Sequence, residues 1–281
     1  MAVGDPLMDG RLDGRVCWVT GASSGIGRAL ADVLAEHGAR SILSGRRADA
    51  LADVAAGKEA LVLPFEATDH ARLPAVVEEA ISWAGHVDLL VNNAGISQRS
   101  PAEVTAFDVY RRLMDVDVLG PIHLTQLLLP HMLARGQGHL AVTASIAGKV
   151  GAPLRTGYCA AKHAVIGYFD ALRAEVEGRG LKVSVIVPGF VATDIARNAL
   201  KGDGAAAGRE DSQIAGGYPA GDAARVIAAG LAAGEREIMV GAEGSLEMGL
   251  PALKAANAEA FFDAMASMGA AEIASYREKW G

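Results

Sequence analysis

The sequence predicts an α/β fold: one domain with a seven-stranded, parallel, doubly wound sheet and helices on both faces. Two observations favour this class. Strand-like and helical patterns alternate along the chain, and most of the strand-like runs are continuously apolar, as expected for strands covered on both faces. Right-handed crossovers should connect them. The predicted strands are Val16–Thr20, Arg40–Ser44, Ala60–Leu63, Asp88–Val91, His139–Thr143, Lys182–Val187 and Glu237–Val240.

Helical patterns fill the intervals between these strands. Three of the helices should end at a glycine that forms a C-cap, at Gly38, Gly85 and Gly180. The longest helix carries Pro130, where we expect a kink or a break because proline removes a helical hydrogen bond. The predicted helices are Gly25–His37, His70–Ala84, Asp108–Arg135 and Gly157–Arg179.

Composition narrows the function classes. The 281 residues are 51% hydrophobic and 21% charged, which suits one globular domain with a substantial core. A net charge of -7 argues against a nucleic-acid or anionic-membrane partner. The two cysteines show no metal or disulfide spacing, so we expect no metal site and a cytoplasmic location. No run approaches the ~18 apolar residues of a membrane span, and the start lacks the apolar core of a signal peptide.

The chain divides into a tail, a domain and an extension. We expect residues 1–11 to be a flexible tail and residues 12–243 to form the catalytic domain. A stretch rich in Gly and Ala, about 194–217, is either a disordered surface loop or a lid over a substrate cleft. Its place after the sixth strand favours the lid, since ligands bind at the carboxyl ends of such strands. Residues 244–281 form a helical extension, which covers either the cleft or a partner subunit.

A glycine-rich turn follows the first strand and opens a helix. Gly21 permits the tight turn, Gly25 lets the backbone approach a pyrophosphate, and Gly27 allows close contact between helix and strand. The helix N-terminus supplies amide donors and positive partial charge. This context predicts a dinucleotide-binding Rossmann fold. The candidate phosphate-binding residues are Gly21, Ser23, Ser24, Gly25, Ile26 and Gly27.

The end of the second strand predicts which nicotinamide cofactor binds. An NAD site places an acid there for the ribose 2′-hydroxyl, but this chain has Gly45, followed by Arg46 and Arg47. An arginine pairs with a 2′-phosphate, which an acid would repel. We therefore expect NADP(H) rather than NAD(H), with Arg46 as the first candidate and Arg47 as the second. The alternative is that both arginines are solvated loop residues.

Ser145, Tyr158 and Lys162 form a candidate proton-transfer site. Tyr158 and Lys162 are four residues apart and share one face of a helix. A lysine cation favours the phenolate and lowers the phenol pKa. A hydroxyl from Ser145, on a separate loop, would hold a substrate oxygen against the phenol. The alternatives are a helix contact for Tyr158 and Lys162 and a turn residue for Ser145.

These motifs together resemble the short-chain dehydrogenase/reductase superfamily over residues 12–242. The matching pieces are the turn at 20–27, Asn92 to Gly95, Ser145, the Tyr158–Lys162 pair, and Pro188-Gly189 with Thr193, all in the expected order. The run from Ser145 to Glu177 resembles the dehydrogenase/reductase member 7 and 7B group. The resemblance implies a homodimer or homotetramer, formed through the Asp108–Arg135 and Gly157–Arg179 helices.

The resemblance also implies roles for individual residues. Tyr158 would be the acid in reduction and the base in oxidation. Lys162 would bind the nicotinamide ribose and lower the tyrosine pKa, and Ser145 would bind the substrate oxygen. A helix N-cap is the alternative for Thr193. The remaining residues expected to contact the cofactor are Ile26, Asn93, Ala94, Gly95, Pro188, Gly189, Val191 and Thr193.

Two residues depart from the family pattern. Asp117 stands where the family usually has an asparagine, which kinks the long helix and offers its carbonyl to a water that leads to the lysine. An ionised Asp117 would weaken the pull of Lys162 and raise the tyrosine pKa, unless it is protonated or solvated. Glu66 replaces the usual aspartate that binds the adenine amino group, and we expect it to accept the same bond.

We expect an NADP(H)-dependent oxidoreductase that interconverts a carbonyl and an alcohol by hydride transfer. The substrate is a small, moderately hydrophobic molecule. One alternative is a catalytically weak NADP-binding sensor or scaffold, which the substitution at Asp117 supports. A second is a sugar-nucleotide epimerase, which the spacing of the glycine turn and of Ser145 and Tyr158 disfavours.

Overall fold

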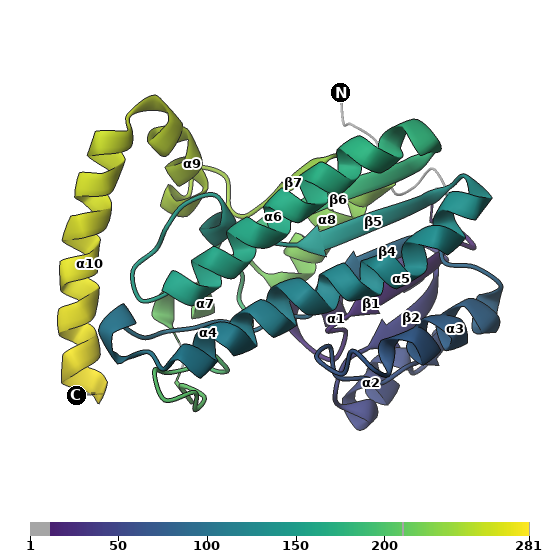
Figure 1. Ribbon diagram of the computed structural model, residues 1–281, viewed down its shortest axis with the longest axis horizontal. Coiled ribbons are helices and arrows are strands. Elements are labelled where there is room, and N and C mark those ends of the chain that lie inside the picture. The colour runs from purple at the N-terminus through teal and green to yellow at the C-terminus, as the bar shows by residue number, and fades with distance from the viewer. Residues whose placement is uncertain (1–11, 210, 281) are drawn as a thin grey trace.

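The computed structural model describes residues 12–209 and 211–280, and seven strands form one parallel sheet within it (Figure 1). The strand order is β3-β2-β1-β4-β5-β6-β7, which confirms the predicted doubly wound α/β class. The expected tail at 1–11 lies outside the described residues. The strands are β1 (Val16–Thr20), β2 (Arg40–Ser44), β3 (Ala60–Val62), β4 (Leu89–Asn92), β5 (Gly138–Thr143), β6 (Leu181–Pro188) and β7 (Glu237–Val240).

Helices cover both faces of the sheet (Figure 1). Alternate residues of β1 point to opposite faces, so Trp18 packs on one side while Cys17 and Val19 pack on the other. The face with Trp18 is covered by α3 (Leu73–Ala84), α5 (Gly120–Arg135) and α6 (Thr156–Val176). The opposite face is covered by α1 (Gly25–Glu36), α2 (Ala48–Ala55) and α8 (Ala220–Ala233).

Trp18 is fully buried in the sheet. Its indole Nε1 donates a hydrogen bond to Ser44 Oγ at 2.9 Å, which satisfies its one polar atom. The ring also meets Phe65 edge to face, with 6.4 Å between the ring centroids. These contacts join β1, β2 and the segment after β3 into one rigid layer below the carboxyl ends of the strands.

The predicted long helix is irregular at a different place from the one we expected. Helix α4 (Phe107–Met114) is followed by a π-helical turn, η2 (Asp115–Leu119), and then by α5. Helix α5 continues through Pro130 to Arg135, so the expectation of a break at that proline is wrong. The irregular turn instead surrounds Asp117, in keeping with the association of π-turns with functional sites.

Two of the helices that cover the sheet, α2 and α8, were not predicted from the sequence pattern. Helix α2 is only 8 residues long, and α8 lies in an alanine-rich run that gives little contrast between its faces. The apolar residues Ile227 and Leu231 of α8 do recur at helical spacing, and Gly234 ends the helix in the left-handed conformation. Both helices complete the cover on the face opposite Trp18.

The remaining elements are the two C-terminal helices and several short helical turns. A short helix, α7 (Ser212–Ala215), ends the segment between β6 and α8. The predicted helical extension is two helices, α9 (Leu246–Ala256) and α10 (Ala258–Trp280), and Figure 1 shows α10 at the edge of the molecule. Single turns of 3-10 helix are η1 (Ala102–Val104), η3 (Ile146–Gly148) and η4 (Glu177–Arg179). No described helix is long and apolar enough to cross a membrane.

Candidate active site

The carboxyl ends of the central strands open into a cavity of about 1640 Å³. Most residues predicted to bind a cofactor or substrate line this one cavity, although they come from distant parts of the chain. Gly27 and Asp117 do not line it and lie directly behind its wall. The predicted residues on its wall are Gly21, Ser23, Ser24, Gly25, Ile26, Arg46, Arg47, Glu66, Asn93, Ala94, Gly95, Ser145, Tyr158, Lys162, Pro188, Gly189, Val191 and Thr193.

The glycine turn between β1 and α1 is built for close backbone approach. Gly21 has a φ of 66°, a conformation that favours glycine, and a Cβ there would lie 2.8 Å from Ala94 Cα. A Cβ on Gly27 would lie 2.4 Å from the Gly21 carbonyl, as expected for tight contact between helix and strand. Helix α1 starts at Gly25, on the cavity wall, so its positive N-terminus fits a dinucleotide pyrophosphate.

Asn93 ties the ends of three strands together. Its Nδ2 donates to the Thr20 carbonyl at 3.1 Å, and its Oδ1 accepts from Thr143 Oγ1 at 3.2 Å. Thr20 Oγ1 in turn accepts from the backbone amides of Asn93 and Ala94, at 2.9 and 3.0 Å. These bonds fix β1, β4 and β5 at the edge where the cavity opens.

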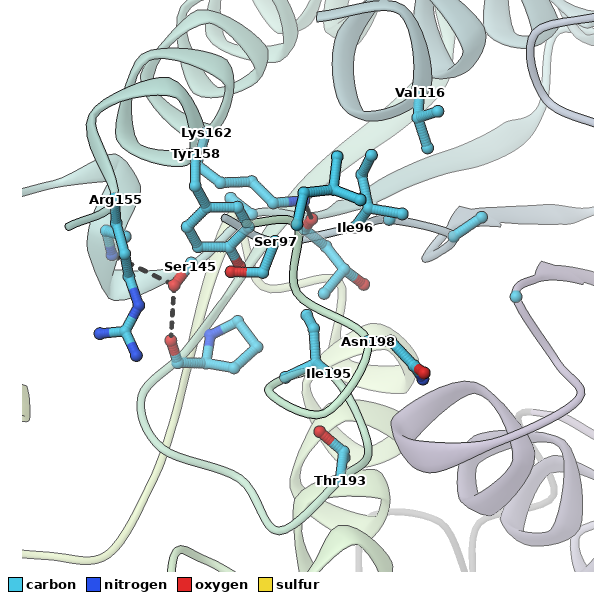
Figure 2. A pocket seen from close by; sticks show the side chains of 18 of the residues that line it. Ile96, Ser97, Val116, Ser145, Arg155, Tyr158, Lys162, Thr193, Ile195 and Asn198 are labelled. Atoms are coloured by element: carbon cyan, nitrogen blue, oxygen red, sulfur yellow. Dashed lines mark hydrogen bonds between the residues drawn. The ribbon is translucent and has the colours of Figure 1, made fainter. Parts of the chain in front are cut away.

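Ser145 and Tyr158 lie together on the cavity wall (Figure 2). Ser145 follows β5 and caps η3, where its Oγ accepts from the Ala147 amide at 3.1 Å and donates to the Pro188 carbonyl at 3.5 Å. Tyr158 lies in the first turn of α6 and is almost fully buried. The two hydroxyl groups therefore come from separate elements to one point of the wall.

Lys162 lies one turn after Tyr158 and is held from two sides. Its Nζ donates to the Thr143 carbonyl at 3.0 Å and lies 3.3 Å from Asp117 Oδ2. The other carboxylate oxygen of Asp117 accepts the Ile96 amide at 2.8 Å. Gly95 lies against this pair, because a Cβ there would lie 3.3 Å from Lys162 Nζ and 3.4 Å from Asp117 Oδ1.

Burial and the neighbouring charges together shift the pKa of Tyr158, Lys162 and Asp117. Burial raises the pKa of Tyr158 and outweighs Lys162, which lowers it, while Asp117 raises it further. Burial alone would lower the pKa of Lys162, but Asp117 and Tyr158 raise it above its ordinary value. Burial also raises the pKa of Asp117, against Lys162 and the Ile96 amide. The lysine thus acts on the phenol in the expected direction, but the net shift of the Tyr158 pKa is upward.

The far end of the cavity carries Arg46, Arg47 and Glu66. Arg47 Nη2 donates to Ser23 Oγ at 3.1 Å, across the glycine turn, whereas Arg46 Nε lies 3.8 Å from Glu66 Oε2. Both arginines follow Gly45, whose missing side chain leaves the end of β2 without an acid. This end of the cavity therefore offers guanidinium groups on either side of the β2 terminus.

The segment after β6 supplies the opposite wall. Thr193 Oγ1 donates to the Val191 carbonyl at 3.3 Å and is followed by turns, so the alternative of a helix N-cap is wrong. The Gly/Ala-rich segment is not detached from the domain, because the Leu200 amide donates to the Ser97 carbonyl at 2.8 Å. Its residues on the cavity wall are Asp194, Ile195, Asn198, Leu200, Gly204, Ala206 and Ile214.

The C-terminal extension closes the substrate side of the cavity. Residues of both α9 and α10 line the cavity of the same chain. Helix α9 brings Leu246 and Leu250 to the wall, and α10 brings Met265 and Met268. The same helices also bring Glu247 and Glu272, so their contribution to the wall combines apolar side chains with two acids.

Residues 15–204 match the protein family described as "short chain dehydrogenase". That match covers the glycine turn, Ser145, Tyr158 and Lys162. The chain belongs to the short-chain dehydrogenase family. Members of this family are oxidoreductases that use NAD or NADP, and the superfamily expected from the sequence is confirmed.

Similar proteins also support the assignment of this chain to the short-chain dehydrogenase family. Mouse dehydrogenase/reductase SDR family member 7B is 40% identical over 218 residues, which are 74% of this chain and 68% of the relative. A Burkholderia phymatum short-chain dehydrogenase/reductase in complex with NAD has a TM-score of 0.78 at 26% identity and covers 89% of this chain and 95% of its own. A metagenomic short-chain oxidoreductase in complex with NADP has a TM-score of 0.61 at 31% identity and covers 63% and 83%.

Two arginines are among the wall residues of this dehydrogenase that the sequence patterns did not identify. Arg99 follows the Asn92–Gly95 motif, and Arg155 lies three residues before Tyr158; both line the cavity. Each stands within four residues of a recognised motif, which is the one local signal that marks them. Their acidic partners come from segments more than 50 residues away, so no local pattern connects them.

Proposed function

We propose that this dehydrogenase interconverts a carbonyl and an alcohol with NADP(H), using Tyr158 as the acid and base. The observation that carries the proposal is the convergence of Ser145, Tyr158 and Lys162 on the wall that the glycine turn also lines. The nicotinamide would supply or accept the hydride. The protein would orient the substrate and move the proton.

Each residue has a role that follows from its position. Ser145 Oγ is anchored by the Pro188 carbonyl and the Ala147 amide, so it presents a fixed hydroxyl to the substrate oxygen. Tyr158, with its raised pKa, is protonated near neutral pH and can donate to a developing alkoxide. Lys162 keeps its charge beside the phenol ring, with Nζ 5.6 Å from the ring centroid, and stabilises the phenolate after transfer.

The preference for NADP(H) over NAD(H) rests on the end of β2. Gly45 leaves no carboxylate to bind a 2′-hydroxyl, while Arg46 and Arg47 provide cations for a 2′-phosphate. Arg47 is the better placed of the two, because it already reaches Ser23 at the phosphate turn. The Glu66 carboxylate is paired with Arg46 and remains the candidate acceptor for the adenine amino group.

The substrate side favours a moderately apolar, uncharged carbonyl compound. Helices α9 and α10 line it with two acids and four apolar residues, and methionine side chains adapt to ligands of irregular shape. The acids are Glu247 and Glu272, and the apolar residues are Leu246, Leu250, Met265 and Met268. We therefore propose ketones and aldehydes with an apolar body as the substrate class.

The test is NADPH oxidation with a panel of ketones, aldehydes, steroids and quinones, repeated with NADH. Tyr158→Phe removes the acid, and we expect turnover to fall by roughly 10²–10⁴-fold while NADPH still binds. Tyr168→Phe is the matched control, because Tyr168 lies on the same helix and packs on Phe169. Equal turnover by Tyr158→Phe and wild type would refute the mechanism, and faster turnover with NADH would refute the cofactor preference.

A catalytically weak NADP sensor is the second candidate. The observation in its favour is the Asp117–Lys162 ion pair, since a lysine held by a buried carboxylate stabilises the phenolate less. A sensor would bind NADPH with ordinary affinity but consume it with no member of the panel. The same assay therefore separates the two candidates.

A further inference from the structure

Two arginines stand on the substrate side of the cavity wall. Arg99 lies in the loop after β4 and Arg155 directly precedes α6; their side chains are 25% and 15% exposed. Figure 2 shows Arg155 beside Ser145, so its guanidinium lies close to the reacting end of the cavity. A guanidinium on a cavity wall is the side chain best suited to bind a carboxylate or phosphate.

Both arginines are already occupied by acids of the same chain. Asp211 Oδ2 accepts from Arg99 Nη1 and from Arg155 Nη2, the latter at 3.3 Å. Glu272 Oε2 accepts from Arg99 Nη2 at 2.8 Å. The Asp211 side chain is 6% exposed and does not itself line the cavity, so it lies behind the two arginines. We call these four residues the arginine cluster.

The arginine cluster joins four separate elements. Arg99 comes from the β4–η1 loop, Arg155 from the start of α6, Asp211 from the segment before α7, and Glu272 from α10. Two guanidinium groups meet two carboxylates, so the cluster is balanced in charge. The segments that carry the cluster or follow β6 also bring apolar residues to the wall, namely Ile195, Ile214, Leu250, Met265 and Met268.

We propose that Asp211 and Glu272 determine the charge specificity of the substrate site. They occupy the donors of Arg99 and Arg155, so the site accepts uncharged carbonyl compounds and rejects those that carry a carboxylate. Removal of either acid leaves guanidinium donors that an anionic substrate can use. This inference rests on the proposed function, because it concerns the substrate of the same site.

The test uses one ligand pair that differs only in charge. The probes are 4-acetylbenzoate and its methyl ester, which present the same ketone with and without a carboxylate. Binding is measured by calorimetry to the complex with NADP⁺, in which no reduction takes place. We expect the wild type to prefer the ester, and Asp211→Asn to shift the preference toward the acid by about tenfold, as for one hydrogen bond to a charged group.

Asp203→Asn is the matched control. Asp203 lies in the same segment, but it is 63% exposed and pairs with Lys201 at 3.3 Å. Its removal changes the net charge of the protein equally without touching the arginine cluster. We expect the ratio of the two affinities to stay at the wild-type value.

Glu272→Gln is the second variant, in case Asp211→Asn does not fold. It removes the carboxylate that faces Arg99 from α10 and leaves only a neutral amide acceptor, so the preference should shift in the same direction. An unchanged ratio in a folded Asp211→Asn or Glu272→Gln protein would overturn the inference, as would wild-type protein that binds neither probe. Reduction of the ester by NADPH is measured separately, so failure of the proposed function shows in turnover and failure of this inference shows in the ratio.

Discussion

Asp117 accepts a backbone hydrogen bond that a neutral asparagine could accept equally well. Its Oδ1 accepts the Ile96 amide, a bond that an asparagine carbonyl would also accept. Its Oδ2 lies against Lys162 and accepts no hydrogen bond in good geometry, although it is completely buried. The carboxylate therefore adds charge rather than shape, and its effect should appear in the acid–base behaviour of Tyr158.

We predict that Asp117→Asn shifts the pH profile of alcohol oxidation to lower pH. Oxidation needs the phenolate of Tyr158, and the negative charge of Asp117 raises the Tyr158 pKa. Removal of that charge lowers the pKa, so the rising limb of kcat/KM moves to more acidic pH. The measurement is the pH dependence of kcat/KM for wild type and variant.

Asp115→Asn provides the control for that profile. Asp115 belongs to the same π-helical turn, but it pairs with His70 at 3.0 Å, away from Lys162. Its substitution should leave the profile in place. Superimposable profiles for Asp117→Asn and wild type would mean that Asp117 does not act on the phenol.

At the scale of elements, strands and motifs were more predictable than helix irregularities. Five of the seven strands are mostly buried runs, whereas β3 and β7 are partly exposed, and each strand appears within about two residues of its predicted bounds. The irregularity of the long helix was assigned to Pro130 from backbone chemistry alone. Pro130 lies within a continuous helix, while η2 is set by tertiary contacts of Asp117 that no local pattern records.

Some residues of the candidate site were also predictable from the sequence, whereas others were not. Ser145, Tyr158 and Lys162 were predictable because two of them share one helix turn and the third follows a strand. The arginine cluster was not, because Arg99 and Glu272 are 173 residues apart and only the fold joins them. Sequence spacing reports groups on one element, whereas ion pairs across elements depend on packing.

The junction of η2 and α5 gives a prediction at this scale. A Cβ on Gly120 would lie 2.9 Å from the Ala67 carbonyl and 3.2 Å from Ala67 Cβ. We predict that Gly120→Ala lowers the free energy of unfolding by about 1–3 kcal/mol, the usual cost of overpacking. Because Ala67 and Glu66 line the cavity, the affinity for NADPH should fall as well. Urea unfolding and an NADPH titration measure the two effects.

Gly167→Ala is the matched control for that substitution. Gly167 lies in the middle of α6, and a Cβ there would meet no atom within 4 Å. This variant should be more stable than wild type by roughly 0.5–1 kcal/mol, since alanine is the better helix former. If both variants gained stability, the contact between α5 and the β3–α3 loop would not be tight.

On the scale of the whole molecule, the two ends of the parallel strands differ: one end forms the cavity, and the other holds a buried titratable group. The carboxyl ends of the strands carry the cavity, as in other doubly wound folds. The amino ends carry His139, at the start of β5, whose Nε2 lies 2.7 Å from Ser184 Oγ. Burial, then Lys182 and Arg15, lower the pKa of His139 from 6.5 to about 4.

We predict that His139 makes the protein less stable as the pH falls from 6.5 toward 4. The unfolded chain binds a proton at His139 in this range and the folded chain does not, so protonation favours unfolding. The contribution is fully present above pH 6.5 and is lost through this window. Since the side chain is half-buried and water screens part of the penalty, we expect a loss of about 2 kcal/mol.

Urea unfolding at pH 7.5 and pH 4.5 measures this effect. His139→Gln keeps a partner for Ser184 without a titrating group, so its stability should fall less over the same interval. Burial also lowers the pKa of His131, which therefore contributes to the same window in both proteins, whereas the lowered pKa of Asp88 affects stability only below about pH 4, since its unperturbed value is 3.8. An equal loss in wild type and variant would assign the acid sensitivity to other groups.

The burial of Trp18 gives the chain an optical reporter of its own cofactor. The indole lies two residues before Thr20 and against Phe65, and both of those residues line the cavity. Tryptophan emission overlaps the absorption band of a reduced nicotinamide, and the oxidised form lacks that band. Excitation of the protein should therefore transfer energy to bound NADPH but not to bound NADP⁺, so the fraction of sites that hold the reduced cofactor becomes readable in a fluorescence spectrum without any label.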